Sequence, residues 1–129
     1  MNKKTLGMSH LALTVEKLEA CRVFYTKLLN MDSECQPDDD NIYLTSGRDN
    51  LALHRAPKDF NRDKHQSLDH LGFFIATENE VDEWYDFFVE NNVTIKAKPR
   101  THRDGARSFY CADPDGNVVQ LIYHPNITQ

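Results

Sequence analysis

Two histidines occupy equivalent places in the sequence, His10 in the segment SHLALTV and His70 in DHLGFFIA. They stand 60 positions apart, and the same spacing relates Tyr25 to Tyr85. Imidazole nitrogens are good ligands for Fe, Mn, Ni and Zn ions, so an equivalent pair is a candidate metal site. The alternative is two strand histidines whose hydrogen bonds are satisfied within the fold. The sequence leaves both interpretations open.

The elements around these histidines repeat in the same order. A short strand is predicted over 9–15, followed by an amphipathic helix over 17–30 that Asn30 can end. The pattern restarts with a strand over 69–76 and a helix over 77–91, which opens with a T-x-x-E capping box. The predicted buried faces comprise Leu18, Cys21, Phe24, Tyr25, Leu28 and Leu29 in the first helix and Val81, Trp84, Tyr85, Phe88 and Val89 in the second.

Each helix is followed by three short strands. The turn DPDGN at 113–117 is the strongest break among them, because proline pre-sets φ and glycine supplies a positive φ. Residues 56–67 are polar and aperiodic, which predicts a linker between module one (about 8–55) and module two (about 68–125). The strands are predicted at Ser33–Gln36, Asn41–Thr45, Leu51–His54, Thr94–Lys98, Ser108–Ala112 and Val118–Tyr123.

This order predicts the fold class. The chain is expected to be an α+β protein, a single domain over 1–129 made of two βαβββ modules. Each module buries one sheet face under its helix and leaves the other face open. Placed side by side, the modules would form a curved mixed sheet with outer helices and a concave cleft, where small molecules commonly bind.

Composition narrows the classes of partner. The formal net charge of −5 disfavours nucleic acid. No apolar run approaches the length of a membrane span, and no apolar stretch follows the N-terminal lysines as in a signal peptide. The three cysteines form no C-x-x-C motif, which predicts reduced thiols in a cytoplasmic protein.

A basic segment runs over 96–107. Its lysines alternate with less polar residues, which is typical of a strand with one wet face at an exposed sheet edge. Arg103 and Arg107 are left open as an anion-attracting rim for a small acidic substrate.

Four segments together resemble the vicinal oxygen chelate superfamily, the glyoxalase, bleomycin-resistance and dioxygenase group. SHLALTV followed by FYTKLL is similar to the opening of one family module, and LDHLGFFIAT is similar to the opening of the second. The most specific segment, SFYCADPDGNVVQLIYHP, closely resembles the family's closing signature YF-x-DPDGN-x-x-E-L. The resemblance covers about residues 8–125. It implies a cleft that holds a divalent metal, and a homodimer.

By position in that pattern, the resemblance implies His10, His70 and Gln120 as metal ligands. Gln120 departs from the family, which usually has glutamate there. The equivalent place in module one is ambiguous: one register puts Leu53 opposite Gln120, and a register shifted by one residue puts Ala52 and His54 on the inner face.

Further residues are assigned weaker roles. His54, Arg107, Tyr110 and Tyr123 are candidates for supporting a ligand or touching the substrate. His102 and His124 are expected to be solvated, and Cys111 to be a small buried side chain.

Two functions from different classes remain. The first is a metal-dependent enzyme acting on a small oxygen-chelating substrate, as a dioxygenase or as a lyase or isomerase, with Fe, Mn, Ni or Zn as cofactor. The second is a metal-free protein that binds a small molecule, of the bleomycin-resistance type.

Overall fold

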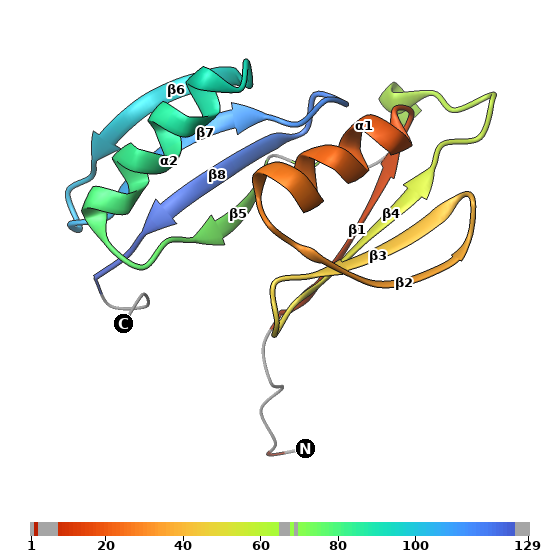
Figure 1. The fold of residues 1–129 in the computed structure, drawn as a ribbon, viewed down its shortest axis with the longest axis horizontal. Helices are drawn as coiled ribbons and strands as arrows, with labels where there is room; N and C mark the ends of the chain where they lie inside the picture. Colours follow the sequence, from red (N-terminus) through yellow and green to blue (C-terminus); the bar gives the residue numbers. More distant parts are fainter. Residues whose placement is uncertain (1, 3–7, 65–67, 69, 126–129) are drawn as a thin grey trace. The chain divides into compact units, whose positions relative to one another are not determined.

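The computed structural model describes residues 2, 8–64, 68 and 70–125. The chain divides into two compact units, Met1–Phe60 and Asn61–Gln129, called here module one and module two. In both, a helix lies across one face of a four-stranded sheet (Figure 1).

Module one contains one helix and four strands. Strands β1 and β4 are parallel neighbours, and the sheet order is β1-β4-β3-β2. The helix is α-helical at first and ends in a π-helical turn, in which the Leu29 amide donates to the Phe24 carbonyl. The elements are β1 (His10–Val15), α1 (Leu18–Val23), η1 (Phe24–Leu28), β2 (Asp32–Asp38), β3 (Asn41–Thr45) and β4 (Asn50–Arg55).

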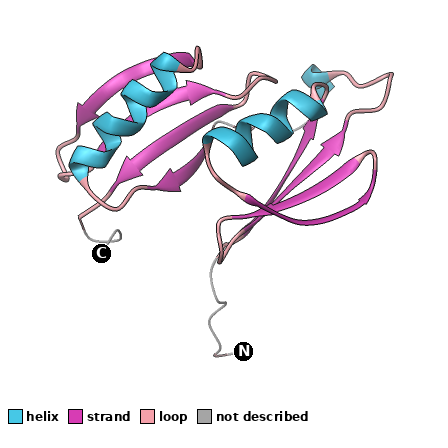
Figure 2. Ribbon diagram, in the orientation of Figure 1, coloured by secondary structure: helices cyan, strands magenta, loops and turns pink. Residues whose placement is uncertain are grey.

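Module two repeats this topology after a short 3-10 turn (Figure 2). Its sheet order is β5-β8-β7-β6, and β5 and β8 are the parallel pair. The βαβββ order is therefore confirmed in both modules. The elements are η2 (Arg62–Lys64), β5 (Leu71–Phe74), α2 (Glu78–Glu90), β6 (Thr94–Thr101), β7 (Arg107–Ala112) and β8 (Val118–Tyr123).

Alternation along the strands separates two faces in each sheet. The face under the helix carries the apolar core of its module. The other face, called here the open face, carries most of the polar side chains of the candidate site. The core includes Leu13, Val15, Leu18, Phe24, Tyr25, Ile42, Leu44, Leu51 and Leu53 in module one and Leu71, Val81, Phe88, Phe109, Cys111, Val119 and Leu121 in module two.

The predicted helix ends are confirmed. Asn30 and Asn92, each just beyond a helix, have φ of 57° and 59°, the left-handed conformation that asparagine tolerates. The Thr77 hydroxyl accepts from the Glu80 amide at 3.2 Å and caps α2. The prediction of a buried side chain was wrong for Val89, which is 48% exposed. Val89 follows the buried Phe88 by one position and therefore points away from the sheet.

Strand β6 lies at the edge of its sheet, as the alternating lysines predicted. It runs three residues further than expected, to Thr101, and pairs with β7 as far as Arg107. In the part of the chain that the structure describes, no helix is long and apolar enough to cross a membrane.

The three cysteines differ in exposure. Cys35 is exposed, whereas Cys21 and Cys111 are buried, and burial raises the pKa of the Cys111 thiol to about 12. Because the thiolate is the reactive form, we expect a thiol reagent at about pH 8 to modify Cys35 alone in the native protein. Mass spectrometry after a short pulse measures this. Native Cys35→Ser should take up no label, and labelling of Cys111 before unfolding would contradict the packing.

Two adjacent phenylalanines on α2 give a matched test of the core. Phe88 is fully buried against Phe109, and Phe87 is 40% exposed. Phe88→Ala should lower the free energy of unfolding by about 3–5 kcal/mol, because it leaves a cavity. Phe87→Ala should cost well under half as much. Denaturant unfolding measures both, and equal losses would contradict the assigned helix face.

Candidate functional site

The DPDGN turn fixes the start of β8 and therefore the place of Gln120. The buried carboxylate of Asp113 accepts hydrogen bonds from the backbone amides of Asp115 and Asn117, at 2.9 and 2.8 Å. Gly116 has φ of 87°, which an L side chain rarely adopts. Four residues beyond it, Gln120 lies on the open face of module two, paired with Tyr110 on β7 and Gly72 on β5.

The amide of Gln120 is held in one orientation. Its Nε2 donates to Ser108 Oγ at 3.2 Å and to Tyr110 Oη at 2.9 Å, so both amide hydrogens are used on the β7 side. The carbonyl oxygen Oε1 is left for another partner. It lies on the β5 side, where Gly72 has no side chain; a Cβ built there would lie 3.7 Å from Oε1.

His70 joins this group through Tyr110. The two rings meet edge to face with centroids 5.4 Å apart. His70 directly precedes β5 and is two residues before Gly72, so the spacing places it on the side toward which Oε1 is turned. The structure thus brings together three residues singled out from the sequence: His70, Tyr110 and Gln120.

The prediction for His102 was wrong. This residue was expected to be solvated, but it is half-buried, and its Nε2 lies 3.0 Å from Ser108 Oγ. Arg100 Nη2 lies 3.1 Å from its Nδ1. Because arginine can only donate, Nδ1 accepts from Arg100. Nε2 therefore carries the ring proton and donates a hydrogen bond to Ser108 Oγ. The signal was the glycine turn at Gly105, which folds β6 back along β7 and brings His102 to Ser108.

A groove of about 790 Å³ runs from this network along the β6–β7 turn. Two exposed arginines, Arg100 and Arg103, give it a basic rim, so Arg103 stays a candidate for attracting an anionic group. Asp104 partly balances them and lies 3.4 Å from His124. His124 was also expected to be solvated, but its side chain is only 20% exposed. The groove is lined by Arg100, Thr101, His102, Arg103, Asp104, Ala106, Gln120 and Ile122.

The open face of module one carries two histidines with similar partners. His10 Nδ1 lies 2.7 Å from Asn50 Oδ1, and Asn50 Nδ2 donates to Glu34 at 2.8 Å. His54 Nδ1 lies 2.6 Å from Asn41 Oδ1.

Asn41 Nδ2 in turn donates to both oxygens of Asp38, at 2.9 and 3.0 Å. This bond, ahead of two backbone amides, lowers the pKa of the Asp38 carboxyl. The result is two hydrogen-bonded series of the same kind, each a histidine, an asparagine and a carboxylate: His10–Asn50–Glu34 and His54–Asn41–Asp38.

Strand pairing resolves the ambiguous register of β4. Ala12 pairs with Ala52 as Gly72 pairs with Gln120, so Ala52 is the equivalent of Gln120. Leu53 is fully buried on the helix side, and the register that placed it opposite Gln120 is wrong. Module one therefore places no metal-binding side chain at this position, and His54 lies on the open face beyond it.

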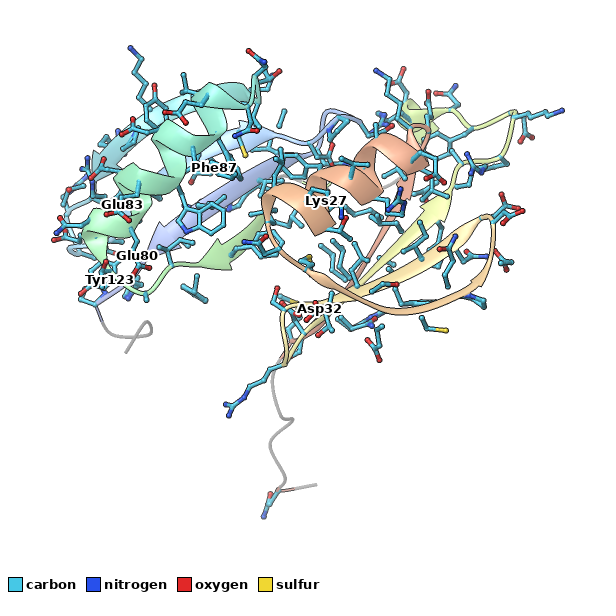
Figure 3. All side chains as sticks on the ribbon, viewed as in Figure 1. Lys27, Asp32, Glu80, Glu83, Phe87 and Tyr123 are labelled. Atoms are coloured by element: carbon cyan, nitrogen blue, oxygen red, sulfur yellow. The ribbon has the colours of Figure 1, made fainter. Side chains whose placement is uncertain are left out.

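Two of the candidate residues lie on the helix side of module two instead. Arg107 donates to both carboxylate oxygens of Asp82 on α2, at 2.7 and 2.9 Å, and this pairing raises the pKa of its guanidinium. Tyr123, at the end of β8, lines a small hollow with Thr77 and Glu78 at the start of α2, near Glu80 in Figure 3. The structure does not bring either residue to the group around Gln120.

The donors on the open face of module two fit a divalent metal. His70 offers an imidazole and Gln120 a carbonyl oxygen whose direction is already set. Within the described residues no three His, Cys, Asp or Glu side chains cluster as a metal site, and the donors here include a neutral amide instead of the usual carboxylate.

Residues 7–121 match the family model of the Glyoxalase/Bleomycin resistance protein/Dioxygenase superfamily. The chain therefore belongs to this superfamily, as the sequence motifs indicated. Solved structures of the fold agree and confirm the predicted fold class. A lactoylglutathione lyase from Agrobacterium tumefaciens superposes with a TM-score of 0.77 at 22% identity, covering 94% of this chain and 96% of that one.

Two curated relatives with higher sequence identity to this chain than the lyase carry the same name. A metallothiol transferase FosB from Staphylococcus epidermidis is 30% identical over 116 residues, covering 89% of this chain and 80% of that protein. A metallothiol transferase FosB from Staphylococcus saprophyticus is 31% identical over 117 residues, covering 89% and 75%. The chain is similar to these enzymes over most of their length.

The glycine in the turn before β8 can be tested directly. Gly116→Ala should lower the free energy of unfolding by about 1–2 kcal/mol, because the positive φ strains any residue with a Cβ. No atom within 4 Å would meet the new methyl group, so the loss is conformational. Gly116→Asn should lose less, since asparagine tolerates this conformation. Thermal unfolding measures both, and an unchanged stability in Gly116→Ala would contradict the turn geometry.

Proposed function

We propose that this protein is a metal-dependent enzyme in which His10, His70 and Gln120 hold a divalent ion of Fe, Mn, Ni or Zn, and which acts on a small substrate with chelating oxygens. The observation that carries the proposal is the orientation of Gln120. Ser108 and Tyr110 use both hydrogens of its amide and leave Oε1 turned toward the strand that His70 precedes. A homodimer and a cytoplasmic location are part of the same proposal.

A metal held there would act as a Lewis acid toward the oxygens of the substrate. The chain's own residues prepare the rest. Ser108 and Tyr110 hold Gln120 in place, and Tyr110 also contacts the His70 ring. Arg100 and Arg103 attract an anionic group to the groove beside them. Because Gln120 is neutral, the ligand set carries one negative charge fewer than a set with glutamate, and an anionic substrate would compensate for it.

Thiol transfer to a small electrophile is the reaction class that the relatives favour, since they are named metallothiol transferases. An isomerase that uses a metal-bound glutamate as base fits less well, because the two last-strand positions are Ala52 and Gln120. The remaining proton carriers near Gln120 are His102, through Ser108, and Tyr110. Dioxygenase chemistry, which also normally uses an acidic ligand, stays the lesser candidate.

A metal-free binding protein is the second candidate. The amide hydrogens of Gln120 are already satisfied within the sheet, so the residue can serve as part of a polar wall for a bound molecule. The groove beside it would then bind a small anion without catalysis.

Metal content separates the two candidates. Purified without chelators or an affinity tag, the protein should carry close to one metal ion per chain by mass spectrometry, and His70→Ala should lose it. Gln120→Glu should bind the ion more tightly, because the carboxylate adds a negative charge at the same position. His54→Ala is the control, a histidine of the open face outside the proposed ligand set, and should keep the metal.

Absence of metal from the native protein, with metal gained by Gln120→Glu, would overturn the metalloenzyme and support the binding protein. If metal is present, thiol-transfer activity is measured as the consumption of a low-molecular-weight thiol in the presence of small electrophiles. 2-Oxoaldehyde hemithioacetals and catechols are tested as substrates for the other reactions. Metal should also raise the melting temperature, since it binds the folded state.

A further inference from the structure

The orientation of Asn50 on the open face of module one is fixed by charge. Its Nδ2 lies 2.8 Å from Glu34 Oε2, and a carboxylate can only accept a hydrogen bond. The amide nitrogen therefore faces Glu34, and the amide oxygen faces His10, 2.7 Å from its Nδ1.

That orientation sets the tautomer of His10. An amide oxygen only accepts, so Nδ1 must carry the proton and donate it. In the neutral ring Nε2 then holds a lone pair. His10 is exposed, and the described residues offer its Nε2 no hydrogen-bond partner. A histidine that binds a metal through one nitrogen typically donates its other N–H to a fixed acceptor, which orients the ring.

We infer that Asn50 and Glu34 are positioning residues that hold His10 with Nε2 presented to a metal ion, an inference that rests on the proposed function. Neither residue was singled out from the sequence. In module two the same strand register makes Val118 the equivalent of Asn50, and a valine side chain cannot accept a hydrogen bond.

The chain supplies its own control. His54, Asn41 and Asp38 form the same arrangement, with Nδ1 donating to Asn41 Oδ1 at 2.6 Å, but His54 is outside the proposed ligand set. His102 is the opposite case, because Arg100 donates to its Nδ1 and leaves the proton on Nε2. The hydrogen bonds therefore predict the tautomer of each ring: Nδ1–H for His10 and His54, and Nε2–H for His102.

The first measurement is the tautomer, from ¹H–¹⁵N correlation of the ring nitrogens in metal-stripped protein. The spectra are recorded at about pH 8.5, where a histidine of ordinary pKa carries no charge. His10 and His54 should show Nδ1–H, and His102 should show Nε2–H. Asn50→Leu should release His10 from this tautomer and leave His54 unchanged, whereas Asn41→Leu should do the reverse. Finding Nε2–H on His10 in the wild type would overturn the inference.

The second measurement is Zn²⁺ affinity by titration into the same stripped proteins. Asn50→Leu should weaken Zn²⁺ binding by about 10- to 100-fold, the usual range for residues that orient a ligand. Glu34→Gln should lose less, because a glutamine oxygen can still accept from Asn50. Asn41→Leu should keep the wild-type affinity. In the wild type, Zn²⁺ should shift the Nε2 resonance of His10 and leave the proton on Nδ1.

Wild-type affinity in Asn50→Leu, with Zn²⁺ bound, would overturn the positioning role. No Zn²⁺ binding by the wild type, whether or not Gln120→Glu binds it, would overturn the proposed function itself. The tautomers in the stripped protein are read without any metal, so the two failures are distinguishable. The His10–Asn50 and Asn50–Glu34 hydrogen bonds both lie at the exposed surface. A hydrogen bond there contributes little to folding, so these variants are expected to fold.

Discussion

The parallel pairing of first and last strands is the constraint on which the rest of the structure depends. In module two this pairing sets Gly72 beside Gln120, and in module one it sets Ala12 beside Ala52. Because side chains alternate along a strand, one register decides at once which residues enter the core and which reach the open face. A shift by one residue would bury Gln120 and expose Leu121. Burial of the apolar side chains under each helix therefore stabilises one strand register. That register decides which polar side chains lie on the open face.

Fixed charges then orient the polar groups that the strands have positioned. The carboxylates of Glu34 and Asp38 fix the orientation of the Asn50 and Asn41 amides. Each amide oxygen then places the ring proton of its histidine on Nδ1. The guanidinium of Arg100 does the opposite for His102. Donor-only and acceptor-only groups thus leave amides and imidazoles a single arrangement. Gln120 is held by hydroxyls, which can donate as well as accept. Its neighbours would therefore also suit a glutamate, and the exchange of one residue changes the charge of the site with little change in its support.

The module order, the helix ends, the DPDGN turn and the edge strand β6 were all predictable, because each depends on residues close together in the sequence. Two features of the site were not. His102 was expected to be solvated, and only the closure of β6 on β7 gave it Ser108 as a partner. Arg107 looked like part of a basic rim, but strand alternation turned it toward Asp82, 25 positions earlier. Charge along a sequence does not show which face of a sheet carries it.

The sequence by itself determined the repeat, the superfamily and the equivalence of His10 and His70, because period and spacing are properties of the chain before it folds. Only the tertiary structure decided that Ala52 takes the place equivalent to Gln120, that Ser108 and Tyr110 direct its amide, and that Asn50 and Glu34 direct His10. Each of these depends on which residues of neighbouring strands stand opposite one another. Two registers of residues 51–54 were compatible with the sequence, and packing of the folded core selects one of them.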